Sequence, residues 1–379
     1  MRFLSVSPYP VYPPTFGGQA RIFNIAKSLV KEKVDVTILS NTSFLFGNQK
    51  NKIVNGVKLN YARTYFQDIA GLLFTKKIAP LIISYPFNTL YGYWLRSKFK
   101  KYDVVQFEQP FLAGWLRFVP NKTIKIYASQ NVEIDFEPLQ FEAKFLNFLY
   151  KGILSYAEKY AIEKADMVTC CSEFDRQKLI SIYDVEPKKI YVVENGFETA
   201  DKVINKAQAR ERLGIPKNIK VAVFVGSISK PNVEAVQVIT EKIAPLCPEM
   251  LFLLLGESSY IAKKNTGNIK VVGGVKNLSL WMQVSDVGLL PMIHGSGTSL
   301  KLLEYLKYGL PVISTKIGAR GYNDLLPYIT IAEISNFSEK LNRQSTKHLD
   351  VKQVTRKYKW NNLAKKLLSF IEYYDIARS

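Results

Sequence analysis

The stretch "HGSGTSLKLLEYLKYGLPVIST", residues 294–315, decides how the second half of this chain folds. Its opening segment, "HGSGTS", combines glycines with small hydroxyl residues, which is typical of a tight loop. The segment "LKLLEYLKYG" repeats leucine at helical spacing and reaches Gly309, a residue type that commonly ends helices. The run "PVIST" follows. The stretch therefore predicts a loop, a helix and a buried strand, in that order.

The composition of the loop at 294–299 suits an anion. The apolar run "VGLLP" at 287–291 reads as a strand, so the loop joins the end of a strand to the start of a helix. Small residues let backbone N–H groups approach a phosphate, and a helix N-terminus carries a positive partial charge. Lys301 is a candidate counter-charge, and Glu304 is a candidate acceptor for sugar hydroxyls. The same residues also suit a plain glycine-rich turn, so both interpretations stay open on this stretch alone.

Strands and helices alternate on both sides of a polar segment at 198–218. The polar composition of this segment predicts a linker with a short helix. Such alternation is typical of parallel sheets covered on both faces, so we expect an α/β fold with two Rossmann-like domains facing a cleft. The predicted strands are 2–7, 34–40, 102–108, 123–131, 165–172, 189–197, 220–227, 250–258, 269–275, 287–292 and 310–316. The predicted helices are 20–33, 134–164, 173–183, 232–243, 278–284, 300–309 and a last segment from about 350.

The composition bounds the class of protein. At 379 residues the chain is too long for one ordinary core, and its 47% hydrophobic and 22% charged residues are typical of a globular protein. No run approaches the ~20 apolar residues of a membrane span, and the N-terminus lacks a secretory signal. Three cysteines suit a reducing cytoplasm, and only His294 and His348 are histidines, so we expect no metal site.

The net charge of +20 bears on partners and not on fold. An anionic membrane surface, phosphorylated substrates and nucleic acid are candidates, but no nucleic-acid-binding motif stands out, so we expect no nucleic-acid role. The stretch "YPFNTLYGYWLRSKFKK", residues 85–101, mixes aromatic and basic residues. It suits either a membrane interface or a core helix with a solvated basic end. The stretch "FEAKFLNFLYK", residues 141–151, has phenylalanines at helical spacing, which favours core packing.

A series of motifs follows one another along the chain in a specific order and spacing. They are "FGGQARIFNIAKSL" at 16–29, "SQNVE" at 129–133, "CSEFDRQKL" at 171–179, "ENGFE" at 194–198, "VFVGSISKPNVEAV" at 223–236, "SDVGLLP" at 285–291 and "GSGTSLKLLEYLKYGLPVIST" at 295–315. With these motifs the chain resembles the family-4 glycosyltransferases over nearly its whole length. These are retaining enzymes of the GT-B architecture that use nucleotide-sugar donors.

The resemblance implies a domain arrangement. The acceptor-binding domain would be residues 1–200, the nucleotide-sugar-binding domain residues 201–350, and the helix in 351–379 would cross back to the first domain. The implied nucleotide-sugar site comprises Gly17, Gly18, Gly226, Ser227, Lys230, Val275, His294, Gly295, Ser296, Gly297, Thr298, Ser299, Leu300, Lys301 and Glu304.

Within that set the resemblance gives different roles to different positions. The glycines near the start lie beside the donor phosphates and the acceptor, and Val275 lies near the base. The backbone amides of 298–300 receive the diphosphate, and Glu304 contacts the ribose. His294 suits either a donor contact or a structural role. The catalytic candidates are Gln130, Lys301 and Glu304, and the candidate acceptor-site polar groups are Asn131, Glu133 and Asp135.

The chain departs from the family pattern at three of these positions. Ser296 stands where the E-x7-E signature has its first acid, Ser227 where an arginine is frequent, and Gln130 at or near the place of a histidine. A glutamine does not titrate, so it can orient an acceptor hydroxyl but cannot take its proton. In a retaining transfer of this type the leaving diphosphate oxygen takes the proton, and the protein positions the reactants and stabilises charge.

We therefore expect a retaining transferase that moves a hexose from a nucleotide diphosphate sugar to a hydroxyl of a lipid-linked glycan. Such a step belongs to cell-surface polysaccharide or lipopolysaccharide synthesis, in the cytoplasm or at the inner membrane face. No metal or other cofactor is expected, since helix N-termini and lysines can neutralise a diphosphate. Two alternatives stay open: an inactive homologue that serves as a partner subunit, and a basic protein that binds phospholipid or nucleic acid.

Overall fold

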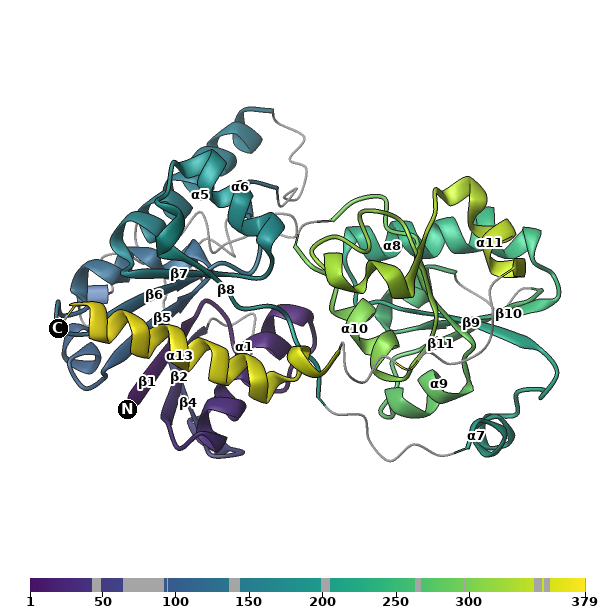
Figure 1. Cartoon of the computed structure of the whole chain (residues 1–379), viewed down its shortest axis with the longest axis horizontal. Helices are drawn as coiled ribbons and strands as arrows, with labels where there is room; N and C mark the ends of the chain where they lie inside the picture. The colour runs from purple at the N-terminus through teal and green to yellow at the C-terminus, as the bar shows by residue number, and fades with distance from the viewer. Residues whose placement is uncertain are drawn as a thin grey trace. The chain divides into compact units, whose positions relative to one another are not determined.

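The computed structural model describes residues 1–42, 49–63, 92–93, 95–135, 144–198, 205–262, 267–295, 297–343, 350 and 355–378. The chain divides into two compact units, each built on its own sheet (Figure 1). Unit 1 comprises Met1–Asn195 and the segment from Trp360 onward, and unit 2 comprises Gly196–Lys359. Each unit is described by itself below.

The observed division differs from the predicted limits at 200 and 350 because of one backbone pairing within unit 2. Phe197 donates its N–H to the carbonyl of Tyr358 at 2.9 Å and forms a parallel bridge with Lys359. The start and the end of unit 2 therefore lie side by side, and both belong to the unit that they enclose. No pattern in the sequence links these two segments, which lie far apart along the chain.

The described residues of unit 1 form a sheet with the strand order β3-β4-β2-β1-β5-β6-β7-β8. Its strands are β1 (Arg2–Ser7), β2 (Asp35–Thr42), β3 (Lys52–Val54), β4 (Val57–Arg63), β5 (Val104–Glu108), β6 (Ile124–Ala128), β7 (Met167–Cys170) and β8 (Ile190–Val192). Neighbouring strands are parallel except β3 and β4, which form an antiparallel hairpin through Asn55 and Gly56. Apart from the edge strand β3, the order is that of a Rossmann fold, whose switch point lies between β1 and β5.

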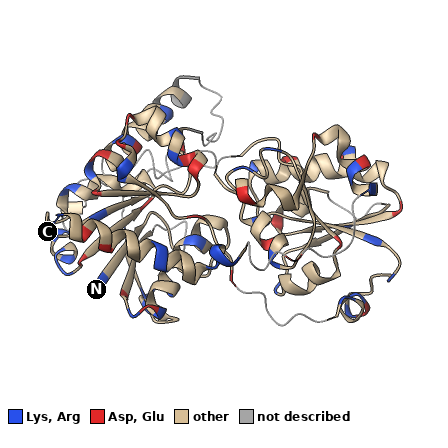
Figure 2. Ribbon diagram, in the orientation of Figure 1, with Lys and Arg blue, Asp and Glu red and all other residues tan. Residues whose placement is uncertain are grey.

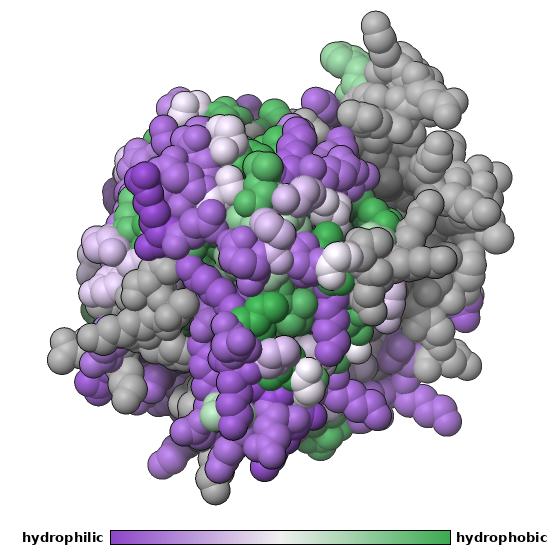
Figure 3. Space-filling model, turned by 90° about the vertical axis from the view of Figure 1, so that its right-hand side faces the viewer, coloured by the Kyte–Doolittle hydropathy of each residue, from purple (hydrophilic) through white to green (hydrophobic). Residues whose placement is uncertain are grey.

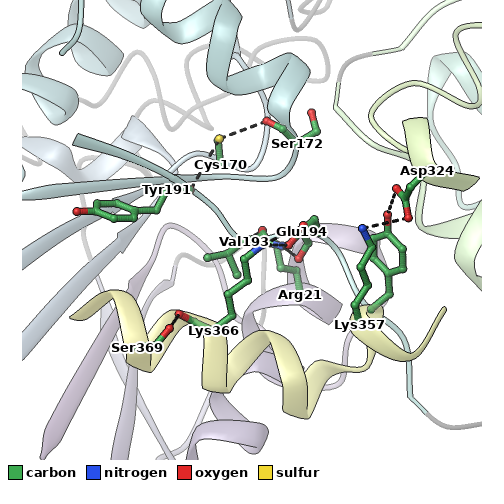
Figure 4. A network of polar contacts seen from close by, with 11 residues as sticks. Arg21, Cys170, Ser172, Tyr191, Val193, Glu194, Asp324, Lys357, Lys366 and Ser369 are labelled. Atoms are coloured by element: carbon green, nitrogen blue, oxygen red, sulfur yellow. Dashed lines mark hydrogen bonds and ion pairs between the residues drawn. The ribbon is translucent and has the colours of Figure 1, made fainter. Parts of the chain in front are cut away.

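Helices cover this sheet. They are α1 (Gly17–Lys31), α5 (Lys144–Lys164), α6 (Glu173–Tyr183) and α13 (Trp360–Arg378). The last helix packs alongside α1 (Figure 1). Figure 4 shows how polar contacts fix both helices to the end of the first chain segment: Lys366 of α13 lies 2.8 Å from a carboxylate oxygen of Glu194, and Arg21 of α1 donates to the carbonyl of Val193 at 2.6 Å. The C-terminal helix is thus an integral part of unit 1.

Unit 2 has the strand order β11-β10-β9-β12-β13-β14 within its described residues, and all neighbouring strands are parallel. Its strands are β9 (Lys220–Val225), β10 (Met250–Leu255), β11 (Ile269–Gly273), β12 (Val287–Leu290), β13 (Val312–Ser314) and β14 (Ile329–Ile331). Counted from β9, this is again the Rossmann order, with its switch point between β9 and β12. The predicted α/β class and the two Rossmann-like domains are confirmed.

Within its described residues, unit 2 has the helices α7 (Lys206–Leu213), α8 (Lys230–Val238), α9 (Leu278–Val284), α10 (Leu300–Lys307) and α11 (Phe337–Arg343). The prediction for α9 is confirmed, and Gly309 follows α10 with a φ of 68°, as expected for a C-terminal glycine. The helix predicted at 232–243 begins earlier, because Pro231 fits a first turn, and it passes after Val238 into a π-helical turn, η5 (Ile239–Ile243).

Short 3-10 segments complete the described secondary structure. They are η2 (Pro110–Phe118), η3 (Glu133–Asp135), η4 (Pro187–Lys189), η6 (Ala244–Leu246), η7 (Glu257–Ala262), η8 (Asn323–Tyr328), η9 (Ile334–Asn336) and η10 (Arg356–Tyr358). Basic and acidic residues are interspersed along the helices of both units (Figure 2). In the described part of the chain, the basic residues are therefore not confined to one tail.

Candidate active site

The loop predicted to bind an anion leaves the carboxyl end of β12 and enters α10 at the switch point of the unit 2 sheet. Tyr305 fixes α10 over the two strands that flank this point. Its hydroxyl accepts from the N–H of Val225 at 3.2 Å and donates to the carbonyl of Leu289 at 3.3 Å. Its ring packs on Gly288, where a Cβ would lie 2.5 Å away. The first turn of α10 is thereby held at the carboxyl edge of the sheet.

Lys301 lies in this first turn and is partly buried. Its Nζ is 5.9 Å from the ring centroid of Phe224 in β9. Burial lowers the pKa of Lys301 to about 8, because the ammonium group loses hydration there. An anion placed beside this group would offset that loss, so the side chain is suited to contact a phosphate.

The N-cap of α10 carries a second group that suits a ligand. The Ser299 hydroxyl is buried and has no hydrogen-bond partner among the described residues. A buried hydroxyl without a partner costs free energy that a bound acceptor or donor would recover. The same helix end was predicted from composition to bind an anion. One turn later, Glu304 accepts from Lys307 at 2.8 Å, and a carboxylate has further acceptor sites for sugar hydroxyls.

The turn after β9 lies at the same edge of the sheet. A Cβ on Gly226 would lie 2.4 Å from the Ser258 hydroxyl, so this position tolerates only glycine without rearrangement. The carbonyl of Ser227 accepts from Nδ2 of Asn232 at 2.8 Å, which fixes the chain as it enters α8. The predicted diphosphate-facing turn is therefore a tightly held backbone segment.

A carboxylate that the sequence analysis missed joins two predicted site residues. Glu234 of α8 has one oxygen 4.0 Å from Nζ of Lys230 and the other 2.9 Å from Nδ1 of His294. The structure thus brings His294 and Lys230 together around one acid. Glu234 lies one helical turn after Lys230, which was a predicted ligand, and this spacing could have indicated it. The contact favours an indirect role for His294.

One predicted residue of unit 2, Val275, lies just after a more distant strand of the sheet. Val275 follows β11, and β9 and β10 separate that strand from β12 in the sheet. Its predicted place beside the base is at the same carboxyl edge of the sheet. Ser296 lies outside the described residues, so the structure says nothing about the predicted loss of the first acid.

In unit 1 the predicted residues meet at the other switch point. A Cβ on Gly18, at the start of α1, would lie 2.7 Å from both Oε1 of Gln130 and the hydroxyl of Tyr9. Gly17 precedes it as the first residue of the helix. The structure therefore places Gln130 directly against the predicted glycine loop. Tyr9 follows β1, and sequence reasoning missed it.

Glu108 at the end of β5 completes this arrangement and was also missed. It is 3% exposed, and its oxygens accept from Ser5 at 2.9 Å, from Gln106 at 2.6 Å and from Nε2 of Gln130 at 3.3 Å. Burial raises the pKa of Glu108, and the three donors partly offset this. Because Glu108 holds Nε2 of Gln130, the amide oxygen Oε1 points toward Gly18. The signal for Glu108 was an acid at the carboxyl end of a strand next to the switch point.

Glu133, expected to serve in the acceptor site, is instead an interior residue. It is 1% exposed and accepts from Gln109 at 3.4 Å, and its backbone N–H donates to buried Glu158 at 3.0 Å. Burial and the charge of Glu158 raise the pKa of Glu133 well above its usual value. The backbone carbonyl of Asn131 accepts from Ser129, and the side chain of Asp135 lies outside the described residues.

The aromatic stretches give a mixed result. Phe148 is 78% exposed, so the expected core packing of 141–151 is wrong for this residue, and most other side chains of that stretch lie outside the described part. In the basic stretch, Tyr93 is 47% exposed and stacks under the Arg96 guanidinium at 4.0 Å. Phe99 is fully buried, which shows that this segment combines a core face with an aromatic and basic outer face.

Among the described residues, no group of three or more His, Cys, Asp or Glu side chains is placed to hold a metal ion. Within the same part of the chain, no helix is both long enough and apolar enough to cross a membrane.

Comparison with known proteins gives the family. A model described as Glycosyltransferase Family 4 matches residues 16–201, and one described as Glycosyl transferases group 1 matches residues 219–343. The chain is similar to TuaH of Bacillus subtilis, whose name assigns it to teichuronic acid biosynthesis, with 25% identity over 48% of this chain and 48% of that protein. It is also similar to the Escherichia coli UDP-Gal:alpha-D-GlcNAc-diphosphoundecaprenol alpha-1,3-galactosyltransferase, with 27% identity over 44% of this chain.

These matches span less than half of each relative's length, 48% and 47%. Among solved structures, HepE from Anabaena in complex with UDP has a TM-score of 0.62 at 14% identity, covering 100% of this chain and 98% of that one. This likeness supports the fold. The two family models cover most of the chain in the expected order, and both units have the matching architecture. The chain belongs to the family-4-like glycosyltransferases of GT-B architecture.

Proposed function

We propose that this protein transfers a hexose, with retention at the anomeric carbon, from a nucleoside diphosphate sugar to a hydroxyl of a lipid-linked glycan. The observation that carries the proposal is the set of groups gathered at the N-terminal end of α10 in unit 2. There a glycine loop, the unpartnered Ser299 hydroxyl and the partly buried Lys301 ammonium meet at the switch point of a Rossmann-type sheet. This combination suits a diphosphate. HepE, which shares the fold, is known in complex with UDP.

The side chains near Gln130 support a mechanism in which the leaving group accepts the proton of the acceptor hydroxyl. Gln130 has no titratable proton, and Glu108 behind it is buried. In the proposed step the bond between the anomeric carbon and the diphosphate oxygen breaks while the acceptor oxygen bonds to that carbon on the same face. The acceptor proton passes to the departing diphosphate oxygen. Lys301 and the amides at the start of α10 stabilise the charge on that group, and no metal is invoked.

The acceptor side is proposed to lie in unit 1, at Gly18 and Gln130. The E. coli relative is named for a diphosphoundecaprenol-linked acceptor, which supports a lipid-linked glycan and a place in cell-surface polysaccharide or lipopolysaccharide assembly. The exposed Tyr93 and Arg96 suit the interface of an anionic membrane. On the face of the molecule shown in Figure 3, hydrophobic residues lie in small patches among hydrophilic ones. We place the protein in the cytoplasm, attached peripherally to the inner membrane face.

The proposal is tested with a panel of UDP-, GDP-, ADP- and dTDP-sugars and an undecaprenyl-diphosphate-linked sugar as acceptor. We expect one donor to support transfer, and NMR of the product to show the anomeric configuration of the donor. Inversion would contradict the mechanism. Binding of a nucleoside diphosphate without transfer or donor hydrolysis would favour an inactive partner subunit. Salt-sensitive vesicle binding without nucleotide binding would favour a phospholipid-binding protein.

A further inference from the structure

The loop that follows β13 places an arginine against the glycine loop of the donor site. Nη2 of Arg320 donates to the carbonyl oxygen of Gly295 at 2.9 Å and to that of Gly297 at 3.0 Å. One guanidinium nitrogen therefore holds two carbonyls of the segment that we assign to the diphosphate. Arg320 is not among the residues that the sequence motifs indicated.

The position of Arg320 is set by a series of contacts with the end of β12. Thr315 donates its N–H to the carbonyl of Leu290 at 3.1 Å and its hydroxyl to the carbonyl of Met292 at 2.7 Å. The N–H of Gly318 donates to the Thr315 hydroxyl at 3.2 Å, and a Cβ on Gly318 would lie 2.8 Å from the Leu290 carbonyl. The segment that carries Arg320 is thus fixed to the strand from which the glycine loop begins.

The two hydrogen bonds also set the direction of an amide. In a trans peptide the C=O and the following N–H lie in one plane and point in opposite directions. Because Arg320 holds the carbonyl of Gly297, the N–H of Thr298 is turned away from Arg320. Gly297 has a φ of 70°, a conformation that glycine adopts without strain. Donors that are oriented before the ligand binds require no reorganisation when it arrives.

We propose that Arg320 is a positioning residue for donor binding: it holds the carbonyls of Gly295 and Gly297 and thereby orients the N–H of Thr298 toward the diphosphate. This inference rests on the proposed function, since it assigns the same loop to the same ligand. It predicts that Arg320 matters for the diphosphate part of a nucleotide and not for the nucleoside part.

The test compares Arg320→Gln and Arg320→Lys with Lys316→Gln. Lys316 is an exposed cation of the same loop, so its variant controls for the loss of one positive charge. Calorimetry measures the affinities for UDP, GDP, ADP and dTDP and for the matching nucleosides. For the nucleotide that the wild type binds, we expect Arg320→Gln to weaken diphosphate binding by about ten- to hundredfold, the effect of a lost hydrogen bond to a charged donor. Nucleoside affinity and the Lys316→Gln variant should stay near wild type.

Each outcome decides between the claims. If the wild type binds no nucleotide, the proposed function fails and this inference fails with it. If the wild type binds but Arg320→Gln binds equally well, the inference is overturned while the proposed function stands. Equal losses for nucleoside and diphosphate, with a lowered Tm, would reduce Arg320 to a structural contact. If Arg320→Gln does not fold, Arg320→Lys decides, since it keeps the charge but loses the guanidinium fork, and we expect an intermediate affinity.

Discussion

We predict that donor binding depends on pH, because the pKa of Lys301 is depressed. Its pKa of about 8 lies below the ordinary value of 10.5, because burial disfavours the ammonium form. The second ionisation of a phosphate, near pH 6, is already about nine tenths complete at pH 7. Raising the pH from 7 to 9 therefore removes most of the charge of Lys301 with little change in the charge of a nucleoside diphosphate.

The expected magnitude follows from the fraction of Lys301 that is protonated in the free protein. With a pKa of about 8, that fraction falls from about nine tenths at pH 7 to about one tenth at pH 9. If binding requires the charged form, the Kd for the nucleotide rises about tenfold over this range. Lys301→Arg keeps its charge throughout, so its Kd should be nearly constant. Lys301→Met should bind weakly at both values.

Stability of the free protein should move in the opposite direction. Between the folded pKa of about 8 and the unfolded value near 10.5, the unfolded chain binds more protons, so the free energy of unfolding rises with pH. Calorimetric titrations at pH 7, 8 and 9, with thermal melts on the same samples, measure both trends. A wild-type Kd that is the same at pH 7 and pH 9 would refute the assignment of Lys301 to the diphosphate.

Three further predictions concern packing and orientation. Gly288→Ala places a methyl group 2.5 Å from the Tyr305 ring, and such overpacking should cost about 1–3 kcal/mol, seen as a lower Tm in thermal melts. Gly18→Ala displaces the amide of Gln130 and the hydroxyl of Tyr9 and should lower transfer rates; unchanged transfer would contradict the placement. Glu108→Gln sets a second amide against that of Gln130 and should raise the KM for the acceptor more than the Kd for the donor, as steady-state kinetics would show.

The fold could be predicted because each half of the chain repeats a local pattern. Apolar runs such as Met250–Leu255 read directly as buried strands, and the alternation with helices implies parallel sheets. The edge hairpin of β3 and β4 was missed, since short, half-exposed strands such as Lys52–Val54 have no continuous apolar run. The predicted strand at 189–197 shortens to Ile190–Val192, because polar residues after it form the connection to unit 2.

The site could be predicted only where a loop joins a strand to a helix. Composition indicates the glycine loop and Lys301, because small residues and a lysine at the start of a helix suit an anion whatever the tertiary structure. Arg320 and Glu234 were missed because their roles depend on tertiary contacts. Nothing in the sequence shows that the loop after β13 returns to the loop after β12. Glu133 was placed wrongly for a related reason: a motif gives a residue's position along the chain but not its burial.

The arrangement in unit 1 bears on which group could accept the proton of the acceptor, since Gln130 stands at or near the place of a histidine in the family pattern. A carboxylate behind the glutamine could in principle accept a proton, but Glu108 already accepts from Ser5, Gln106 and Gln130 and is 3% exposed. Its oxygens are occupied by donors that orient other groups, so it is suited to fix Gln130 and not to meet a substrate. In the proposed function, Gln130 would therefore offer an acceptor hydroxyl a fixed amide oxygen and would not act as a base. The proposed mechanism accordingly gives the acceptor proton to the diphosphate that we propose binds at α10, because the basicity of that group rises as the sugar leaves.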